Sequence, residues 1–219
     1  MPRYNSRMQA SLFDLQTEQG GYTQLPLQDA DVRYYPNWIE GAKANEYFNT
    51  LSDTLDWRQD TIKLYGKEHL IPRLQAWYGD HDAHYEYSGV PLVPLKWTAE
   101  LTVLKHLCEG VAGQKFNSVL ANWYRHGQDS MGMHSDDEPQ LGRQPTIASV
   151  SLGAERNLIF KHKQTKQRVP LSLAHGSLLI MSGQTQHYWQ HGINKTAKPI
   201  DGRINLTFRR IYHDNSAAY

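Results

Sequence analysis

The fold of this chain is decided by residues 146–182, which read TIASVSLGAERNLIFKHKQTKQRVPLSLAHGSLLIMS. Short runs rich in β-branched, Leu and aromatic residues follow one another here, at 146–152, 156–162, 168–173 and 177–182. Gly, Pro and Asn residues punctuate them, as is usual at turns between strands. Similar runs flank the stretch at 118–124 and 203–211. Many short strands with little intervening helix are typical of a β-sandwich or jelly roll.

Two amphipathic helices are expected before these strands. The first has apolar residues at three- and four-residue steps on one face: Ala44, Tyr47, Phe48, Leu51 and Leu55. The second is expected over about 98–109, with a stripe formed by Leu101, Leu104 and Cys108. Both would pack on one outer face of the strands. The predicted fold class is therefore α+β, with a sandwich or jelly-roll core braced by N-terminal helices.

The composition predicts one domain in a reducing compartment. A chain of 219 residues forms one full core, and its single cysteine excludes an internal disulfide framework. Its 23 Lys and Arg against 22 Asp and Glu leave a formal charge of +1, so polyanion binding would need a local patch. No apolar run has membrane-spanning length, and no signal peptide is visible. We expect a monomeric, soluble protein of the cytoplasm, or of the nucleus in a eukaryote.

The first thirty residues differ from the rest of the chain. Residues 1–30 are rich in Gln, Ser and Gly, with scattered apolar side chains. This composition favours a flexible N-terminal arm. The single domain would then span residues 31–219.

A metal site is suggested by MGMHSDDEPQ, residues 131–140. His134 and Asp136 are two residues apart, so a strand would place both side chains on one face. Non-haem Fe(II) oxygenases bind iron with two His and one carboxylate on one face of an octahedron. An isolated His-x-Asp pair is common by chance, so a third ligand is required. Downstream candidates are His162, His175, His187, His191 and His213. Position favours His191, with His187 four residues earlier as the alternative.

The segment RINLTFRR, starting at residue 203, predicts a strand with one unusual face. Arg203 and Arg209 are separated by an even offset and share a face with Asn205 and Thr207. The opposite face is apolar. Two buried guanidinium groups are costly unless paired, and a dicarboxylic acid would pair them through planar, bidentate hydrogen bonds. The alternative is a solvated edge with two surface arginines.

Taken together, several segments resemble the AlkB family of Fe(II)- and 2-oxoglutarate-dependent dioxygenases, and especially the branch of the two human homologs that repair alkylated DNA. They are NWYRHGQDSMGMHSDDE, TIASVSLG, FKHK, LAHGSLLIM, HYWQHG and RINLTFRRI. The resemblance covers residues 63–211, with the motifs in family order. It implies a double-stranded β-helix, or jelly-roll, core. It also implies removal of methyl groups from bases such as 1-methyladenine and 3-methylcytosine in DNA, using Fe(II), O2 and 2-oxoglutarate and releasing formaldehyde and succinate.

The resemblance assigns roles to individual residues. The iron ligands fall on His134, Asp136 and His191. The residues for 2-oxoglutarate fall on Asn122, Tyr124, Arg203, Asn205, Thr207 and Arg209. A nucleotide-recognition lid falls on about 63–95. Tyr65 in this lid stands where the DNA-repair branch of the family carries an apolar residue that probes the gap in the duplex. The residues around the flipped base fall on Tyr87, Tyr85, Arg73, Asp137 and Glu138. The two carboxylates suit the positive charge of a methylated base, and an ordinary aromatic core is the alternative for the tyrosines.

A basic segment follows the third predicted strand. The stretch KHKQTKQR, 161–168, carries Lys161, Lys163, Lys166 and Arg168. Such a hairpin can bind backbone phosphates without reading sequence. A charged, solvated turn is the alternative interpretation.

The N-terminal arm contains a short motif. Gln9, Leu12 and Phe13 lie in a pentapeptide, 9–13, that resembles the peptide with which bacterial repair proteins bind the replicative sliding clamp. A helix start with two apolar residues is the alternative.

These features favour an oxidative DNA demethylase. Alternatives are the same chemistry on RNA or on protein side chains, and a jelly-roll module that binds nucleic acid without turnover. The dicarboxylate clamp argues against a pure binding module, which has no need of it.

Overall fold

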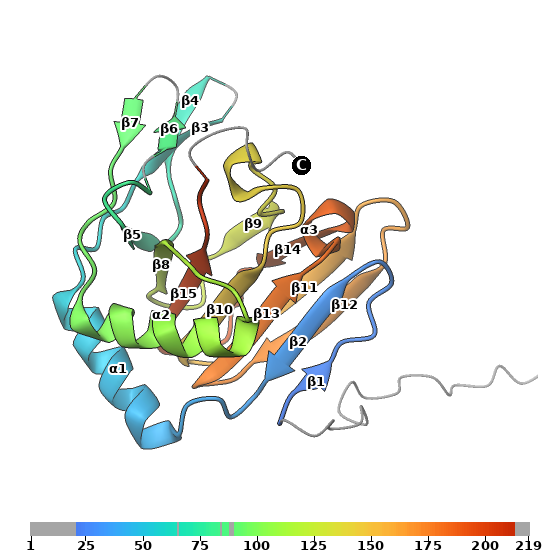
Figure 1. Ribbon diagram of the computed structural model, residues 1–219, viewed down its shortest axis with the longest axis horizontal. Coiled ribbons are helices and arrows are strands. Elements are labelled where there is room, and N and C mark those ends of the chain that lie inside the picture. Colours follow the sequence, from blue (N-terminus) through green and yellow to red (C-terminus); the bar gives the residue numbers. More distant parts are fainter. Residues whose placement is uncertain (1–20, 65, 84, 88–89, 213–219) are drawn as a thin grey trace, which may run out of the picture.

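The computed structural model describes residues 21–64, 66–83, 85–87 and 90–212. Two antiparallel sheets face one another, and two long helices lie against the outside of the larger sheet (Figure 1). This is the α+β jelly-roll architecture that the sequence predicted. Among the described residues, no helix has both the length and the apolar character needed to cross a membrane.

The larger sheet has seven strands. Their order across the sheet is β1 (Thr23–Gln24), β2 (Asp31–Tyr35), β13 (Ser177–Ser182), β10 (Ile147–Gly153), β15 (Arg203–Arg209), β8 (Ser118–Tyr124) and β5 (Leu74–Gly79). Strand β15 pairs with both β10 and β8, so Arg203 lies beside Tyr124 and Asn205 beside Asn122. Because side chains alternate along each strand, these four residues share one face of the sheet.

The smaller sheet has four strands, in the order β12 (Arg168–Leu173), β11 (Arg156–His162), β14 (Trp189–Ile193) and β9 (Met131–His134). The short helix α3 (Thr185–Tyr188) directly precedes β14, and the 3-10 helix η2 (Pro139–Leu141) follows β9. The pairing of β14 with β9 places His191 opposite His134. Two residues that are far apart in sequence thus meet at the interior face of this sheet.

The helices cover the outer face of the larger sheet. Helix α1 (Gly41–Thr54) buries Ala44, Tyr47 and Leu51, and α2 (Ala99–Ala112) buries Leu101, Leu104 and Cys108. The Thr98 hydroxyl accepts a hydrogen bond from the N–H of Leu101 at the start of α2, and Gly113 (φ 67°) ends it in the left-handed conformation. These side chains pack against Ile204, Leu206 and Phe208 of β15. The apolar face of that strand therefore lies under the helices.

A second core fills the space between the two sheets. It joins Tyr124 and Ile147 of the larger sheet to Phe160 and Trp189 of the smaller one. Leu25 and Leu27 are buried in this same core, and β1 pairs with β2. The arm expected over residues 1–30 is therefore wrong for residues 23–27, whose alternate leucines are held in the core. Residues 1–20 lie outside the described residues.

The expected lid, about 63–95, covers most of one small hairpin, all of a second one, and strand β5 between them. One hairpin pairs β3 (Thr61–Leu64) with β4 (Lys67–Leu70), and the other pairs β6 (Tyr85–Tyr87) with β7 (Val90–Leu92). Both lie at one end of the molecule in Figure 1. Strand β5 between them is an edge strand of the larger sheet, so this segment is continuous with the core.

Candidate metal centre and adjoining cavities

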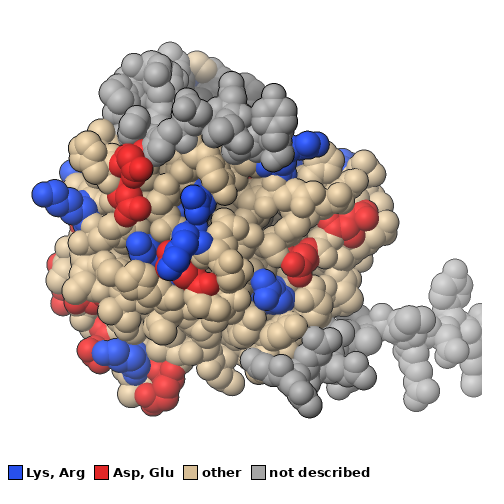
Figure 2. All heavy atoms as spheres, viewed as in Figure 1, with Lys and Arg blue, Asp and Glu red and all other residues tan. Residues whose placement is uncertain are grey.

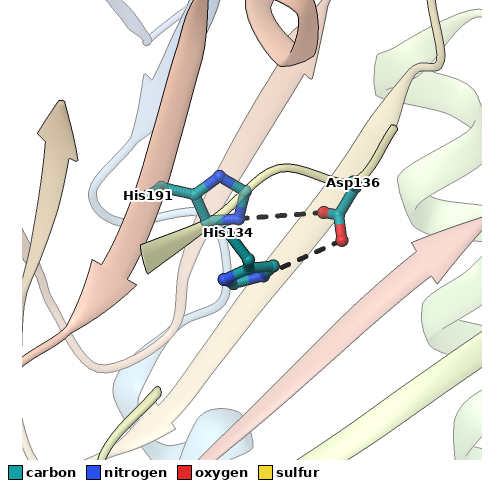
Figure 3. A group of neighbouring side chains, drawn as sticks. All are labelled: His134, Asp136 and His191. Atoms are coloured by element: carbon teal, nitrogen blue, oxygen red, sulfur yellow. Dashed lines mark ion pairs between the residues drawn. The ribbon is translucent and has the colours of Figure 1, made fainter. Parts of the chain in front are cut away.

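Two imidazoles and one carboxylate meet in the interior between the sheets (Figure 3). Asp136 Oδ1 lies 3.9 Å from His134 Nε2, and Asp136 Oδ2 lies 3.7 Å from His191 Nε2. The ligand atoms of the three residues all lie within 4.8 Å of one another. Asp136 Oδ2 is buried and has no hydrogen-bond partner among the described residues. This donor set is the one that non-haem Fe(II) enzymes use, and the free oxygen fits a metal ligand.

The local backbone differs from the sequence expectation. Strand β9 ends at His134, so Asp136 reaches the site from the following loop rather than from the same strand face. The loop is held by Gln186 of α3, whose side-chain carbonyl accepts a hydrogen bond from the N–H of Asp136 at 2.9 Å. Gln186 is itself buried. Sequence reasoning missed this residue, because nothing near it in sequence marks it.

The structure distinguishes the candidate histidines. His191 points to Asp136, whereas His187 is exposed on α3. His162 accepts hydrogen bonds from N–H groups of its own hairpin, and His175 accepts one from the N–H of Gly153. His213 lies outside the described residues. Among those described, His191 is the histidine that joins His134 and Asp136.

Burial and charge act in opposite directions on the carboxylate. Burial disfavours the ionised form of Asp136, but Arg209, His191 and His134 outweigh it and hold its pKa below the usual value. Arg209 Nη2 donates to Asp136 Oδ1 at 2.5 Å. Burial, with His134 and Arg209 nearby, lowers the pKa of His191 to about 3. The site therefore presents an ionised carboxylate and a neutral imidazole at neutral pH, which are the protonation states that metal ligation needs.

Arg203 lines a narrow cavity together with these ligands, and its guanidinium is incompletely paired within the described part of the chain. It is 1% exposed and donates from Nη2 to Ser151 Oγ at 2.9 Å. Its Nε and Nη1 atoms have no hydrogen-bond partner among the described residues. The guanidinium lies 5.3 Å from the centre of the Tyr124 ring, and burial lowers its pKa to about 10. Unpaired buried donors on a cation are costly, and a carboxylate would accept hydrogen bonds from such a guanidinium.

The rest of the predicted cosubstrate set lines the same narrow cavity. Its lining includes Asn122, Tyr124, Arg203, Asn205, Thr207 and Arg209 together with His134, Asp136 and His191. Asn205 donates to Ser149 Oγ at 2.8 Å, and Thr207 donates to the side chain of Asn205 at 3.1 Å. Serine partners of this kind were missed. Their signal is the polar alternation of Ser149 and Ser151 within an otherwise apolar strand.

A second, larger cavity of about 330 Å³ adjoins the first. Arg209 lines both, so it stands at their common wall. Trp77 and Leu120 extend the interior face of the larger sheet into this cavity. Carboxylates around it come from Asp56, Asp60 and Glu138. The chain thus provides an open chamber beside the candidate metal ligands.

The residues predicted to surround a base are only partly brought together. Glu138 lines the larger cavity. Arg73 donates from Nε to Asn122 Oδ1 at 2.8 Å, which places it beside the cosubstrate set. Asp137 is exposed and pairs with Lys163 at 3.1 Å. The side chains of Tyr85 and Tyr87, and residue Tyr65, lie outside what the structure describes.

The basic hairpin joins β11 to β12. Lys166 and Arg168 are exposed, and Lys161 is half-buried opposite Arg168. Lys163 is engaged within the protein by Asp137 and by the carbonyl of Gln186. Acidic and basic side chains are interspersed on the face drawn in Figure 2, so that face carries no broad basic field. The clamp-like residues Gln9, Leu12 and Phe13 lie outside the described residues.

Comparisons with known proteins agree with this geometry. The family model described as "2OG-Fe(II) oxygenase superfamily" matches residues 31–209 and implies Fe(II) and 2-oxoglutarate. The chain is 40% identical over 181 residues to "DNA oxidative demethylase ALKBH2" of Homo sapiens, covering 78% of this chain and 69% of that protein. It is 39% identical over 197 residues to "Alpha-ketoglutarate-dependent dioxygenase alkB homolog 3" of Homo sapiens, covering 85% and 68%.

A solved structure, that of OsALKBH1, shares the fold with a TM-score of 0.57 at 15% identity, covering 82% of this chain and 97% of that one. The fold, the match to the family model and the sequence identity to the two human relatives all agree on one family. The chain belongs to the AlkB family of the 2OG-Fe(II) oxygenase superfamily.

Proposed function

We propose that this protein oxidatively removes methyl groups from alkylated bases in DNA, with Fe(II), O2 and 2-oxoglutarate. The observation that carries the proposal is one narrow cavity that holds both a His-Asp-His donor set and a buried arginine. Two donors of this arginine have no partner within the part of the chain that the structure describes. A relative at 40% identity named a DNA oxidative demethylase supports the substrate class.

The fit of a metal rests on the donor set itself. His134, Asp136 and His191 would hold Fe(II) and leave the opposite face open for other ligands. Asp136 Oδ2 is buried without a partner among the described residues, which a metal would supply. Bound Fe(II) would supply the redox chemistry that couples O2 and the decarboxylation of 2-oxoglutarate to hydroxylation of a methyl group, which leaves as formaldehyde.

The fit of 2-oxoglutarate rests on Arg203. Its guanidinium would donate to the far carboxylate of the cosubstrate, and the Tyr124 ring packs against the same guanidinium. Asn122, Asn205 and Thr207 line the remaining polar wall. Arg203, fixed in turn by Ser151, would orient the cosubstrate toward the metal ligands.

The larger cavity is the proposed chamber for the flipped base. An enzyme that acts on a base must take it out of the stack. Asp56, Asp60 and Glu138 give this chamber acidic groups, which suit the positive charge of 1-methyladenine or 3-methylcytosine. Trp77 and Leu120 offer apolar surface to the ring. Tyr85 and Tyr87 remain proposed stacking residues, and Asp137 a proposed base contact.

DNA backbone contacts are proposed for the basic hairpin. Lys166 and Arg168 are exposed at its turn, and Lys161 lies opposite Arg168. Arginine and lysine neutralise phosphates without reading sequence, so these residues would set affinity rather than lesion choice. The clamp peptide at 9–13 and a monomeric state remain separate proposals.

The test is mass spectrometry of an oligonucleotide carrying one 1-methyladenine, incubated in air with protein, Fe(II), ascorbate and 2-oxoglutarate. We expect the methyl group to be lost in the complete mixture alone. The matched variants are His191→Ala, expected to be inactive, and His187→Ala, expected to retain activity because His187 is exposed away from the site.

Three outcomes separate the alternatives. Succinate formation without demethylation of DNA would indicate that the enzyme is active but acts on RNA or protein instead. DNA binding with neither demethylation nor succinate formation, in protein shown to hold iron, would favour a binding module. Activity lost in His187→Ala and kept in His191→Ala would overturn the ligand assignment.

A further inference from the structure

A chain of hydrogen bonds connects the basic hairpin to the candidate metal ligand Asp136. The Lys163 ammonium donates to the backbone carbonyl of Gln186, and the N–H of Asp136 donates to the side-chain carbonyl of Gln186. The two distances are 2.8 Å and 2.9 Å. Both hydrogen bonds thus involve one buried residue, Gln186, which links Lys163 to Asp136.

Gln186 is held from several sides. It is 1% exposed, and its amide nitrogen lies 3.6 Å from the sulfur of Met181, a residue that lines the narrow cavity. Its side-chain carbonyl fixes the loop that carries Asp136. Because Asp136 lies beyond the end of β9, no sheet hydrogen bond of that strand sets its position. The hydrogen bond from the Asp136 N–H to Gln186 takes the place of a sheet hydrogen bond in fixing this part of the backbone.

Lys163 fixes the helix on which Gln186 lies. Its ammonium group donates to the carbonyl of Gln186, and its backbone N–H donates to the carbonyl of Tyr188 at 2.7 Å. The last carbonyls of a helix lack partners within the helix, and a lysine can supply them. Helix α3 leads directly into β14, which carries His191. The ion pair of Lys163 with Asp137 is largely solvent-exposed, so the carbonyl bonds are the stronger constraint.

We infer that Gln186 is a positioning residue for the metal ligand Asp136, and that Lys163 positions Gln186 in turn. This inference rests on the proposed metal site. It gives Lys163 a role within the protein, distinct from the phosphate contact that its place in the basic hairpin suggested. Partners behind metal ligands orient them, and their loss usually lowers metal affinity by about 10- to 100-fold.

The test is a titration of the full-length protein with Co(II) alone, without DNA or 2-oxoglutarate, followed by the absorption of the bound ion. Gln186→Met removes the acceptor at nearly the same volume. We expect it to weaken Co(II) binding by about 10-fold and to shift the absorption bands. Gln184→Leu is the matched control, because Gln184 is exposed and its side chain does not cap α3.

Three further variants separate the two roles of Lys163. Lys163→Met is expected to weaken Co(II) binding in the absence of DNA, and Lys163→Arg to restore most of it. Lys161→Met removes the same charge from the same hairpin and is expected to leave Co(II) affinity as in the parent. Lys163 lies at the surface, so its variants keep the test valid even where Gln186→Met folds poorly.

The outcomes are distinct. Co(II) affinities of Gln186→Met and Lys163→Met within twofold of the parent would overturn the inference while leaving the metal site intact. A parent protein that binds no Co(II) at all would overturn the proposed metal site itself, and the inference with it.

Discussion

Arg209 and Asp136 form an ion pair, with Arg209 Nη2 2.5 Å from Asp136 Oδ1, in the wall between the two cavities. The pair occupies one carboxylate oxygen and leaves Oδ2 facing His191. The Arg209 side chain therefore contacts both the narrow cavity and the larger one. It keeps the Asp136 carboxylate ionised on the metal side, and it also lines the larger cavity on the other.

Replacing Arg209 with Met should destabilise the protein. The Asp136 carboxylate would stay buried without its partner, and breaking a buried pair costs about 3 kcal/mol. Urea unfolding of the metal-free protein at neutral pH measures the loss. Arg210→Met is the control, because Arg210 is the exposed neighbour on the same chain segment. Equal stability of both variants would contradict the importance of the pair.

Acid should weaken the metal-free protein through His191. Its pKa is about 3 in the folded state against an ordinary value of 6.5, so the unfolded chain binds more protons between these values. Stability therefore falls as the pH is lowered through that window, by about 2 kcal/mol from pH 7 to pH 5. Unfolding at several pH values should show this slope reduced in His191→Gln and kept in His187→Gln. An identical slope in all three proteins would refute the argument.

Arg203→Met should separate binding from stability. We expect 2-oxoglutarate affinity to fall by about 100-fold, since a hydrogen bond to a charged group contributes about 1.5–3 kcal/mol. The melting temperature of the cosubstrate-free protein should stay level or rise, because the variant removes a buried cation with unpaired donors. Calorimetry measures both quantities. Unchanged cosubstrate affinity would exclude Arg203 from that role.

The double variant Lys166→Met, Arg168→Met should bind duplex DNA more weakly. The slope of log affinity against log salt is negative, and each lost phosphate contact makes it shallower by about 0.9. Fluorescence anisotropy at several salt concentrations gives that slope. Lys43→Met is the control, because Lys43 lies on α1 and pairs with Glu46. If both variants keep the parental slope, the hairpin is a solvated turn.

Two glycines should respond to alanine with opposite signs. Gly153 has φ +89°, and an added Cβ would clash with the Gly202 carbonyl and lie 2.7 Å from Phe48 Cε2. Gly153→Ala should destabilise the protein by about 2–4 kcal/mol. Gly110 lies in α2 with nothing within 4 Å of an added Cβ, so Gly110→Ala should stabilise it by about 0.5–1 kcal/mol. Thermal unfolding measures the stability change of each variant. A change of the same sign in both variants would contradict the backbone argument.

Much of the β-structure was predictable because its signal is local. The runs at 118–124, 156–162, 168–173 and 177–182 coincide with β8, β11, β12 and β13. Alternation likewise separated the polar face of β15 from its apolar one, which lies under the helices. Residues 23–27 escaped prediction, since a two-residue strand and two isolated leucines carry no periodic pattern.

The sequence by itself determined most strands of the second half of the chain, the two long helices, the family motifs and the identity of His134 and Asp136 as a pair. These depend on side-chain alternation and residue type, which neighbouring residues reveal. The sequence favoured His191 and left His187 as the alternative, and the tertiary structure brings His191 to the pair. Only the tertiary structure decided that Gln186 holds Asp136 in place. It also decided that Lys163 bonds within the protein. Such contacts join residues more than twenty positions apart, so they exist only after the sheets pair and the core excludes water.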